Sequence, residues 1–165
     1  MAIHETGCLD YTELSGLRHV PSEKRYMQGP VAVIECVQCI PCNPCESACS
    51  KNAIHIGEPI TNLPELDEDK CTGCGLCVSR CPGLAIFIVN KVFTKTTATV
   101  SFPYEYVPLP KEGATVRAVD RKGAYICDGK VVKIINPESF DHTPVITVEV
   151  PAGVSDEVRS VERSK

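Results

Sequence analysis

Residues 39–56, CIPCNPCESACSKNAIHI, and residues 71–88, CTGCGLCVSRCPGLAIFI, are two copies of one pattern. Each copy reads C-x2-C-x2-C-x3-C and continues, after three residues, into an alternating A-I-x-I segment. A shift of 32 residues (71 minus 39) brings the four cysteines and three apolar residues of one copy onto the other without insertion. Such agreement indicates an internal repeat, and the alternation predicts a strand at the end of each copy.

The cysteine spacing is typical of proteins that bind two [4Fe–4S] clusters. Three cysteines two residues apart can surround one cluster, while the fourth cysteine of the run binds the cluster of the other copy. The repeat therefore predicts two interlocked ligand sets. Cluster I is expected on Cys39, Cys42, Cys45 and Cys81, and cluster II on Cys71, Cys74, Cys77 and Cys49.

Disulfide bonds and a structural zinc site are two other uses of cysteine that could explain the pattern. A disulfide framework requires an oxidising compartment, and the 11 cysteines of this chain are an odd number. A structural zinc site usually closes with two separated C-x2-C hooks, whereas three consecutive two-residue gaps crowd a tetrahedral site. The spacing therefore favours iron–sulfur clusters.

A ninth cysteine lies just before the first run. Shifted by 32, Cys36 falls on Glu68, so the repeat makes Cys36 the additional cysteine. Cys39 preserves the C-x2-C-x2-C geometry of ferredoxins and is favoured as the cluster I ligand. Cys36 remains the alternative to Cys39 for the same coordination position.

Composition and charge limit the other functions. The chain has 165 residues, a formal net charge of −4 and 5% aromatic residues, and it lacks the basic patches expected of a nucleic-acid binder. It contains neither a secretory signal pattern nor an apolar run near the ~18 residues that span a bilayer. We therefore expect a cytoplasmic protein without a membrane span. No nucleotide fingerprint and no acid–base pair is recognisable, so no catalytic residue is predicted.

Residues 31–90 resemble the bacterial-type ferredoxin with two [4Fe–4S] clusters. The resemblance implies an α+β fold with a βαββαβ core. In this core VAVIE (31–35), AIHIG (53–57) and LAIFIV (84–89) are expected to be strands.

The segments outside this core are expected to have separate roles. Residues 1–30 are predicted to be an N-terminal arm, and residues 152–165 a charged tail. Residues 91–151 alternate β-rich stretches with turn residues, which predicts a small antiparallel, barrel-like docking domain. Within it, CDGK at 127–130 predicts a hairpin turn because Asp-Gly suits type I′ turns.

A second resemblance covers residues 21–151. GPVAVIECVQCIPCNPCE (29–46), GEPITNLPELDEDKCTGCGLCVSRCPGLAIF (57–87) and FPYEYVPLP (102–110) are similar to the small ferredoxin-like subunit of heteromeric FAD-dependent dehydrogenases. This family comprises complexes of the dye-linked proline dehydrogenase, opine oxidase and hydrogen cyanide synthase type. The resemblance implies partner chains that carry FAD and oxidise an amino acid, amine or hydroxy acid. This chain would then relay their electrons to an acceptor.

Members of that family often read ECxQEIPCNPC, with glutamate where this chain has Cys39. In such relatives the residue at the Cys36 position, or a carboxylate, would complete cluster I. This chain departs from the pattern by having both cysteines. A free-standing, diffusible ferredoxin is the alternative function, and a zinc-stabilised scaffold protein is a further one.

Overall fold

The computed structural model describes residues 3–17 and 19–163. The first 90 residues contain helices α1 (Ile3–Thr6), α2 (Tyr11–Ser15), α3 (Glu23–Tyr26), α4 (Pro44–Ala48) and α5 (Leu76–Arg80), and strands β1 (Val31–Ile34), β2 (Ile54–His55), β3 (Glu65–Leu66) and β4 (Ile86–Asn90). The remaining residues contain strands β5 (Thr97–Pro103), β6 (Thr115–Val119), β7 (Tyr125–Ile135), β8 (Val145–Pro151) and β9 (Ser160–Val161), and the 3-10 turns η1 (Glu138–Phe140) and η2 (Ala152–Val154). None of the described helices has the length and apolar character needed to cross a membrane.

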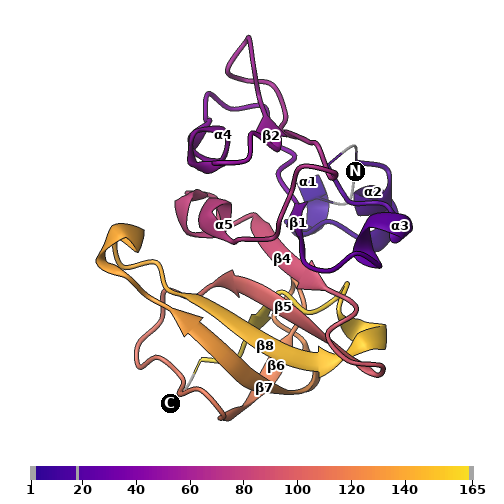
Figure 1. The fold of residues 1–165 in the computed structure, drawn as a ribbon, viewed down its shortest axis with the longest axis vertical. Helices are drawn as coiled ribbons and strands as arrows, with labels where there is room; N and C mark the ends of the chain where they lie inside the picture. Colours follow the sequence, from indigo (N-terminus) through magenta and orange to yellow (C-terminus); the bar gives the residue numbers. More distant parts are fainter. Residues whose placement is uncertain (1–2, 18, 164–165) are drawn as a thin grey trace.

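Seven strands form one antiparallel sheet in the order β1-β4-β5-β8-β7-β6-β9, and β2 and β3 form a separate two-stranded sheet. Figure 1 shows α4 and β2 at one end of the molecule and β6, β7 and β8 at the other. The pairing of β4 with β5 carries the sheet across residue 90, where the sequence predicts a domain boundary. The fold is therefore mixed α/β with a mostly antiparallel sheet, and the boundary and the barrel-like module stay predictions.

The repeat is visible in the backbone as well as in the sequence. Between β1 and β4 the chain runs α4, β2, β3 and α5 in order. Asn52 and Leu84, which the 32-residue shift relates, both adopt positive φ, at 50° and 52°. Each donates its backbone N–H to the carbonyl of the last cysteine of its run, at 3.0 Å to Cys49 and 3.1 Å to Cys81. Each cysteine run therefore ends in a turn of the same conformation. After this turn the first run continues into β2 and the second into β4.

The strands predicted at both ends of the ferredoxin core are present. β1 pairs with β4 from Val31 opposite Val89 to Ile34 opposite Ile86, and all four β1 residues are buried. β2 is shorter than predicted and contains two residues. Apolar side chains of β1, β2, β4 and α5 pack with Cys45 and Cys77 in one core between the helices and the sheet.

The hairpin predicted at residues 127–130 is wrong. Asp128 and Gly129 lie inside β7, and the turn between β6 and β7 is formed by residues 120–124 instead. Gly129 faces β8 so closely that a Cβ atom there would lie 2.5 Å from Cγ1 of Val148. The glycine is thus required for strand packing, and the DRKG sequence at 120–123 supplies the turn.

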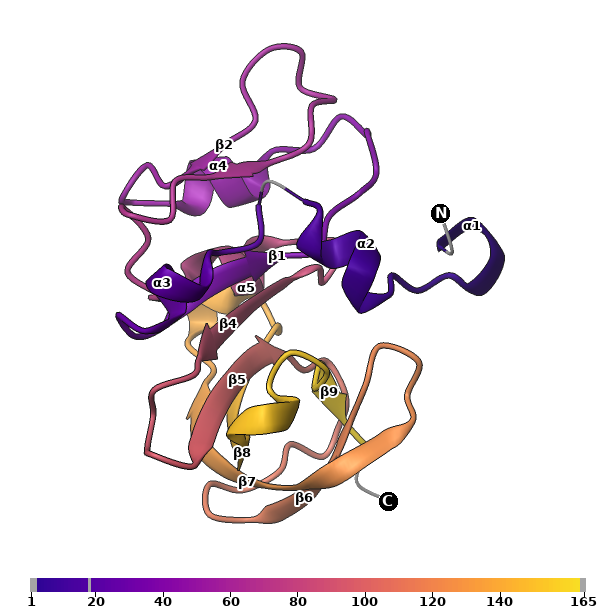
Figure 2. The same cartoon turned by 90° about the vertical axis from the view of Figure 1, so that its right-hand side faces the viewer.

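Segments from both the N-terminal and the C-terminal part of the chain pack on the sheet, including Tyr26, Val158 and Val161. Figure 2 shows α2 and α3 on either side of β1. In the predicted tail, Val158 and Arg159 are buried and β9 pairs with β6, so this segment is ordered structure through residue 163; residues 164 and 165 lie outside the described part. These segments and the sheet thereby support the part of the molecule that carries the two cysteine runs.

Candidate metal centre

Four cysteines from both runs line one cavity beside β1 and β4. The space that protein atoms leave free at this cavity, including space open to solvent, is about 330 Å³. Its sulfur-bearing residues are Cys49, Cys71, Cys74 and Cys77. Cys49 belongs to the first run and the other three to the second, so the fold brings together the set that the sequence predicts for cluster II.

A second cavity, of about 400 Å³ with space open to solvent included, lies farther along the same strands, beside Ile34 of β1 and Ile86 of β4. Its lining cysteines are Cys36, Cys42, Cys45 and Cys81. Cys39 does not line this cavity, and its side chain is exposed to solvent. The predicted cluster I residues are therefore brought together except for Cys39, whose place is taken by Cys36.

Crowding of the thiols is strongest at the third cysteine of each run. Burial raises the pKa of Cys77 to about 12, and repulsion from Cys71, Cys74 and Cys49 adds to this effect. Burial likewise raises the pKa of Cys45 to about 11, with further repulsion from Cys81, Cys36 and Cys42. Four thiolates in such a space require a cationic group among them, because metal ligands must be deprotonated.

Backbone N–H groups point at the sulfur atoms. Ala53 donates to Sγ of Cys49 at 3.2 Å, and its repeat partner Ala85 donates to Sγ of Cys81 at 3.4 Å. Ala32 in β1 donates to Sγ of Cys71 at 3.4 Å. Hydrogen bonds of this kind stabilise thiolates and set the potentials of iron–sulfur clusters.

The second cysteine loop approaches the N-terminal arm very closely. Gly73 has φ of 65°, and a Cβ atom there would lie 2.6 Å from the carbonyl oxygen of Pro30. Glycine is therefore required at this position for two reasons, conformation and space. The loop that presents Cys71 and Cys74 is fixed against the segment that leads into β1.

Each cavity lies near the molecular surface. Ile40 lines the cavity of Cys36 and is 49% exposed, and Leu76 lines the cavity of Cys49 and is 39% exposed. Cys74 is exposed as well. The lining of each cavity therefore includes residues that are exposed to solvent.

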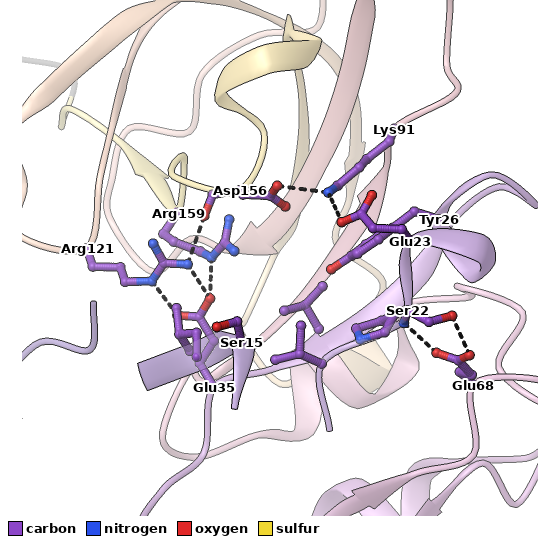
Figure 3. A pocket seen from close by; sticks show the side chains of 14 residues that line it. Ser15, Ser22, Glu23, Tyr26, Glu35, Glu68, Lys91, Arg121, Asp156 and Arg159 are labelled. Atoms are coloured by element: carbon purple, nitrogen blue, oxygen red, sulfur yellow. Dashed lines mark hydrogen bonds and ion pairs between the residues drawn. The ribbon is translucent and has the colours of Figure 1, made fainter. Parts of the chain in front are cut away.

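A buried ion cluster lies next to Cys36, at the junction of β1 with the C-terminal segments. Glu35 accepts two hydrogen bonds from Arg121, at 2.6 and 2.8 Å, and one from Arg159 at 2.6 Å. Figure 3 shows these three side chains at one side of a pocket that is also lined by the ion pair of Lys91 with Asp156. Burial alone would raise the pKa of Glu35, but the hydrogen bonds and charges of Arg121 and Arg159 outweigh it and lower the pKa.

The two cysteine quartets suit a multi-atom cluster. In the described part of the chain, no group of three or more histidine, cysteine, aspartate or glutamate side chains is arranged to hold a single metal ion. Each quartet instead lines a cavity. Three of its cysteines come from one stretch of sequence, 36–45 or 71–77, and the fourth, Cys81 or Cys49, caps the end of the helix in the other stretch. This cross-connected arrangement of thiolates around two adjacent spaces is the ligand pattern of a protein with two [4Fe–4S] clusters.

Comparison with known proteins agrees with this class. Residues 38–85 match the family model of the 4Fe-4S dicluster domain. This part of the chain is thus a dicluster ferredoxin domain that binds two [4Fe–4S] clusters.

Relatives are found among curated proteins. A protein described as an uncharacterized ferredoxin of Methanocaldococcus jannaschii is 36% identical over 93 residues, which cover 56% of this chain and 57% of that protein. The Protein Pixie of Drosophila melanogaster is 34% identical over 71 residues, covering 39% of this chain and 12% of that protein. The chain thus spans little more than half of the first of these relatives and a small part of the second. No solved structure gives a significant match.

The cysteine pattern does not predict several charged residues that lie around the site. Arg25, Arg121 and Arg159 come from segments outside the ferredoxin core and reach its cysteine loops or Glu35 only in the folded chain. From sequence alone, an arginine in a polar arm or a charged tail is expected to lie on the surface in contact with solvent. Burial of Arg25 and Arg159 was therefore not predictable from local sequence.

Proposed function

We propose that the protein is an electron carrier that relays single electrons through its two [4Fe–4S] clusters. When bound, the clusters supply one-electron oxidation and reduction, and the protein tunes their potentials through hydrogen bonds, charge and exposure. The observation that carries the proposal is the pair of cavities, each lined by four cysteines and each close to the surface.

We assign the ligands from the cavity linings. Cluster II is held by Cys49, Cys71, Cys74 and Cys77, and cluster I by Cys36, Cys42, Cys45 and Cys81. For cluster I we propose Cys36 in place of Cys39, which the repeat favours. This choice is supported by the cavity lining, which includes Cys36 and not Cys39, and by the repulsion that Cys36 exerts on the Cys45 thiol.

The partner that we propose is an FAD-containing dehydrogenase of amino acids, amines or hydroxy acids, which would assemble with this chain in the cytoplasm. The sequence resemblance over residues 21–151 supports this proposal. So does the extra structure of the chain, because the arm and strands β5 to β9 exceed what a dicluster domain of residues 38–85 requires. In such a complex these elements would hold the ferredoxin part against the flavoprotein.

Purification of the chain from its own cells, under anaerobic conditions, tests this proposal. We expect a brown complex in which this chain co-elutes with FAD-bearing chains. Addition of the substrate of the flavoprotein should then bleach the iron–sulfur absorbance. A control with the flavoprotein chains alone should reduce FAD but show no iron–sulfur bleaching.

A diffusible ferredoxin is the second candidate, and the ferredoxin relative of Methanocaldococcus jannaschii favours it. This function predicts a brown monomer, free of flavin, that accepts electrons from unrelated reductases. Isolation of that species would contradict the subunit proposal and would leave the electron-carrier proposal intact.

A further inference from the structure

Arg25 is a buried cation with an unusual set of partners. Its side chain is in α3, and the residue is 6% exposed. Its guanidinium donates four hydrogen bonds, all to backbone carbonyls: Glu68 at 2.8 Å, Gly29 at 3.2 Å, Pro30 at 2.9 Å and Cys71 at 2.6 Å.

Among the described residues, no carboxylate forms an ion pair with Arg25. The ion pairs of the structure involve other cations, and the buried Arg159, by contrast, binds Glu35 directly. The carboxylate of Glu68 is engaged by Ser22, whose N–H and hydroxyl donate to it at 2.6 and 2.7 Å. Burying a cation without a counter-ion is strongly unfavourable, so a buried arginine predicts an anion nearby.

The position of Arg25 indicates which anion this is. Its Nη2 atom donates to the carbonyl of Cys71, whose sulfur lines the cluster II cavity and accepts a hydrogen bond from Ala32. The same guanidinium binds Pro30, against which Gly73 of the cysteine loop is packed. A [4Fe–4S] cluster held by four thiolates is an anion, and its negative charge increases on reduction.

We propose that Arg25 is the counter-charge of cluster II and raises the reduction potential of that cluster. The inference rests on the proposed ligands of cluster II and adds a residue from outside the dicluster domain. A fixed cation stabilises the reduced cluster, which is more negative, over the oxidised one. Arg25 acts through the Cys71 loop and is a positioning residue that also supplies charge.

The test is an EPR-monitored redox titration of the loaded protein, with cluster I of the same molecule as internal reference. A Cys74→Ser variant identifies the signal of cluster II. In Arg25→Gln we expect the ratio of reduced to oxidised cluster II at a given potential to fall about tenfold. For a one-electron couple this is a negative shift of about 59 mV. Cluster I should shift much less.

Two variants separate charge from structure. Arg25→Lys keeps the charge and should retain most of the wild-type potential. Lys24→Gln removes a charge from the exposed face of the same helix and should leave both potentials unchanged. If Arg25→Gln fails to load cluster II, loading and a near-normal potential in Arg25→Lys would still support the inference.

An unchanged cluster II potential in a fully loaded Arg25→Gln variant would overturn the inference. So would an equal shift of both clusters, or loss of cluster II in Arg25→Lys, since each result makes Arg25 a structural clamp only. These outcomes are distinct from failure of the proposed function, which would appear as a wild-type protein without two clusters.

Discussion

Cys81 belongs by sequence to the second cysteine run, but in the fold it lines the same cavity as Cys45 of the first run. The two thiols are close enough that the charge of Cys81 contributes to the raised pKa of Cys45. Cys49 makes the reciprocal connection to Cys77 in the other cavity. In the proposed ligand sets, each run therefore depends on the other for its fourth cysteine.

This cross-connection predicts that the last cysteine of each run is needed for the cluster of the other run. Cys81→Ser should damage cluster I, whose other proposed ligands lie in the first run or just before it, and Cys49→Ser should damage cluster II. EPR spectra of the reduced variants, compared with Cys42→Ser and Cys74→Ser as references for each cluster, check this. If the EPR spectrum of Cys81→Ser instead matched that of Cys74→Ser, each cluster would be bound within a single run.

The two candidate ligands of cluster I should differ in their response to substitution. Cys36→Ser is expected to lose iron and the cluster I signal, because Cys36 lines the cavity. Cys39→Ser should retain both clusters, because Cys39 is exposed and outside the lining. Iron and sulfide analysis together with EPR measures the effect. The opposite result would restore Cys39, the residue that the repeat favours, as the ligand.

Glu35→Gln should destabilise the fold, because it leaves the buried guanidinium of Arg159 and the partly buried one of Arg121 without their carboxylate. Breaking a buried ion pair from one side costs about 3–5 kcal/mol. For a chain of this size the midpoint of thermal unfolding should then fall by roughly 10 °C.

The pH dependence of this effect has a defined sign. Since the pKa of Glu35 is lowered in the folded protein, its contribution is complete above the ordinary glutamate pKa and is lost as pH falls through the lowered value. The matched control is Glu162→Gln, which breaks the exposed pair with Arg117 and should change the midpoint little. Equal effects of the two substitutions would contradict a buried ion cluster at this junction.

Gly129→Ala should destabilise the C-terminal strands. The new Cβ atom would lie 2.5 Å from Val148 and 3.1 Å from the carbonyl oxygen of Glu149, so β7 and β8 would have to separate. Overpacking of this kind typically costs about 1–3 kcal/mol. Gly153→Ala is the control, because no atom lies within 4 Å of its Cβ position. Thermal unfolding followed by circular dichroism compares the two, and equal midpoints would show that β8 tolerates the added methyl group.

The repeat predicted most of the site because the spacing of cysteines along the chain determines it. Cysteine spacing fixes which thiols share a loop, and the 32-residue shift relates Cys49 to Cys81 and Ala53 to Ala85, whose sulfur hydrogen bonds recur in the structure. The choice between Cys36 and Cys39 depends on where the chain leaves β1, which spacing does not specify.

Long-range contacts account for what the sequence did not predict. The Asp-Gly pair at 128–129 has strong local turn propensity, but pairing with β6 keeps it in β7, directly before Lys130, where pairing with β8 begins. Arg25 and Arg159 carry no periodic or spacing signal, and their burial follows from contacts with Cys71 and Glu35 far along the chain. Tertiary packing thus decided the positions that local propensity could not.

An anaerobic redox titration of the purified chain, combined with iron, sulfide and zinc analysis, tests the central claim most directly. We expect a brown protein with the iron and sulfide of two [4Fe–4S] clusters that takes up one electron per cluster reversibly, about two per chain. A colourless protein that contains zinc and accepts no electrons would contradict the electron-carrier function.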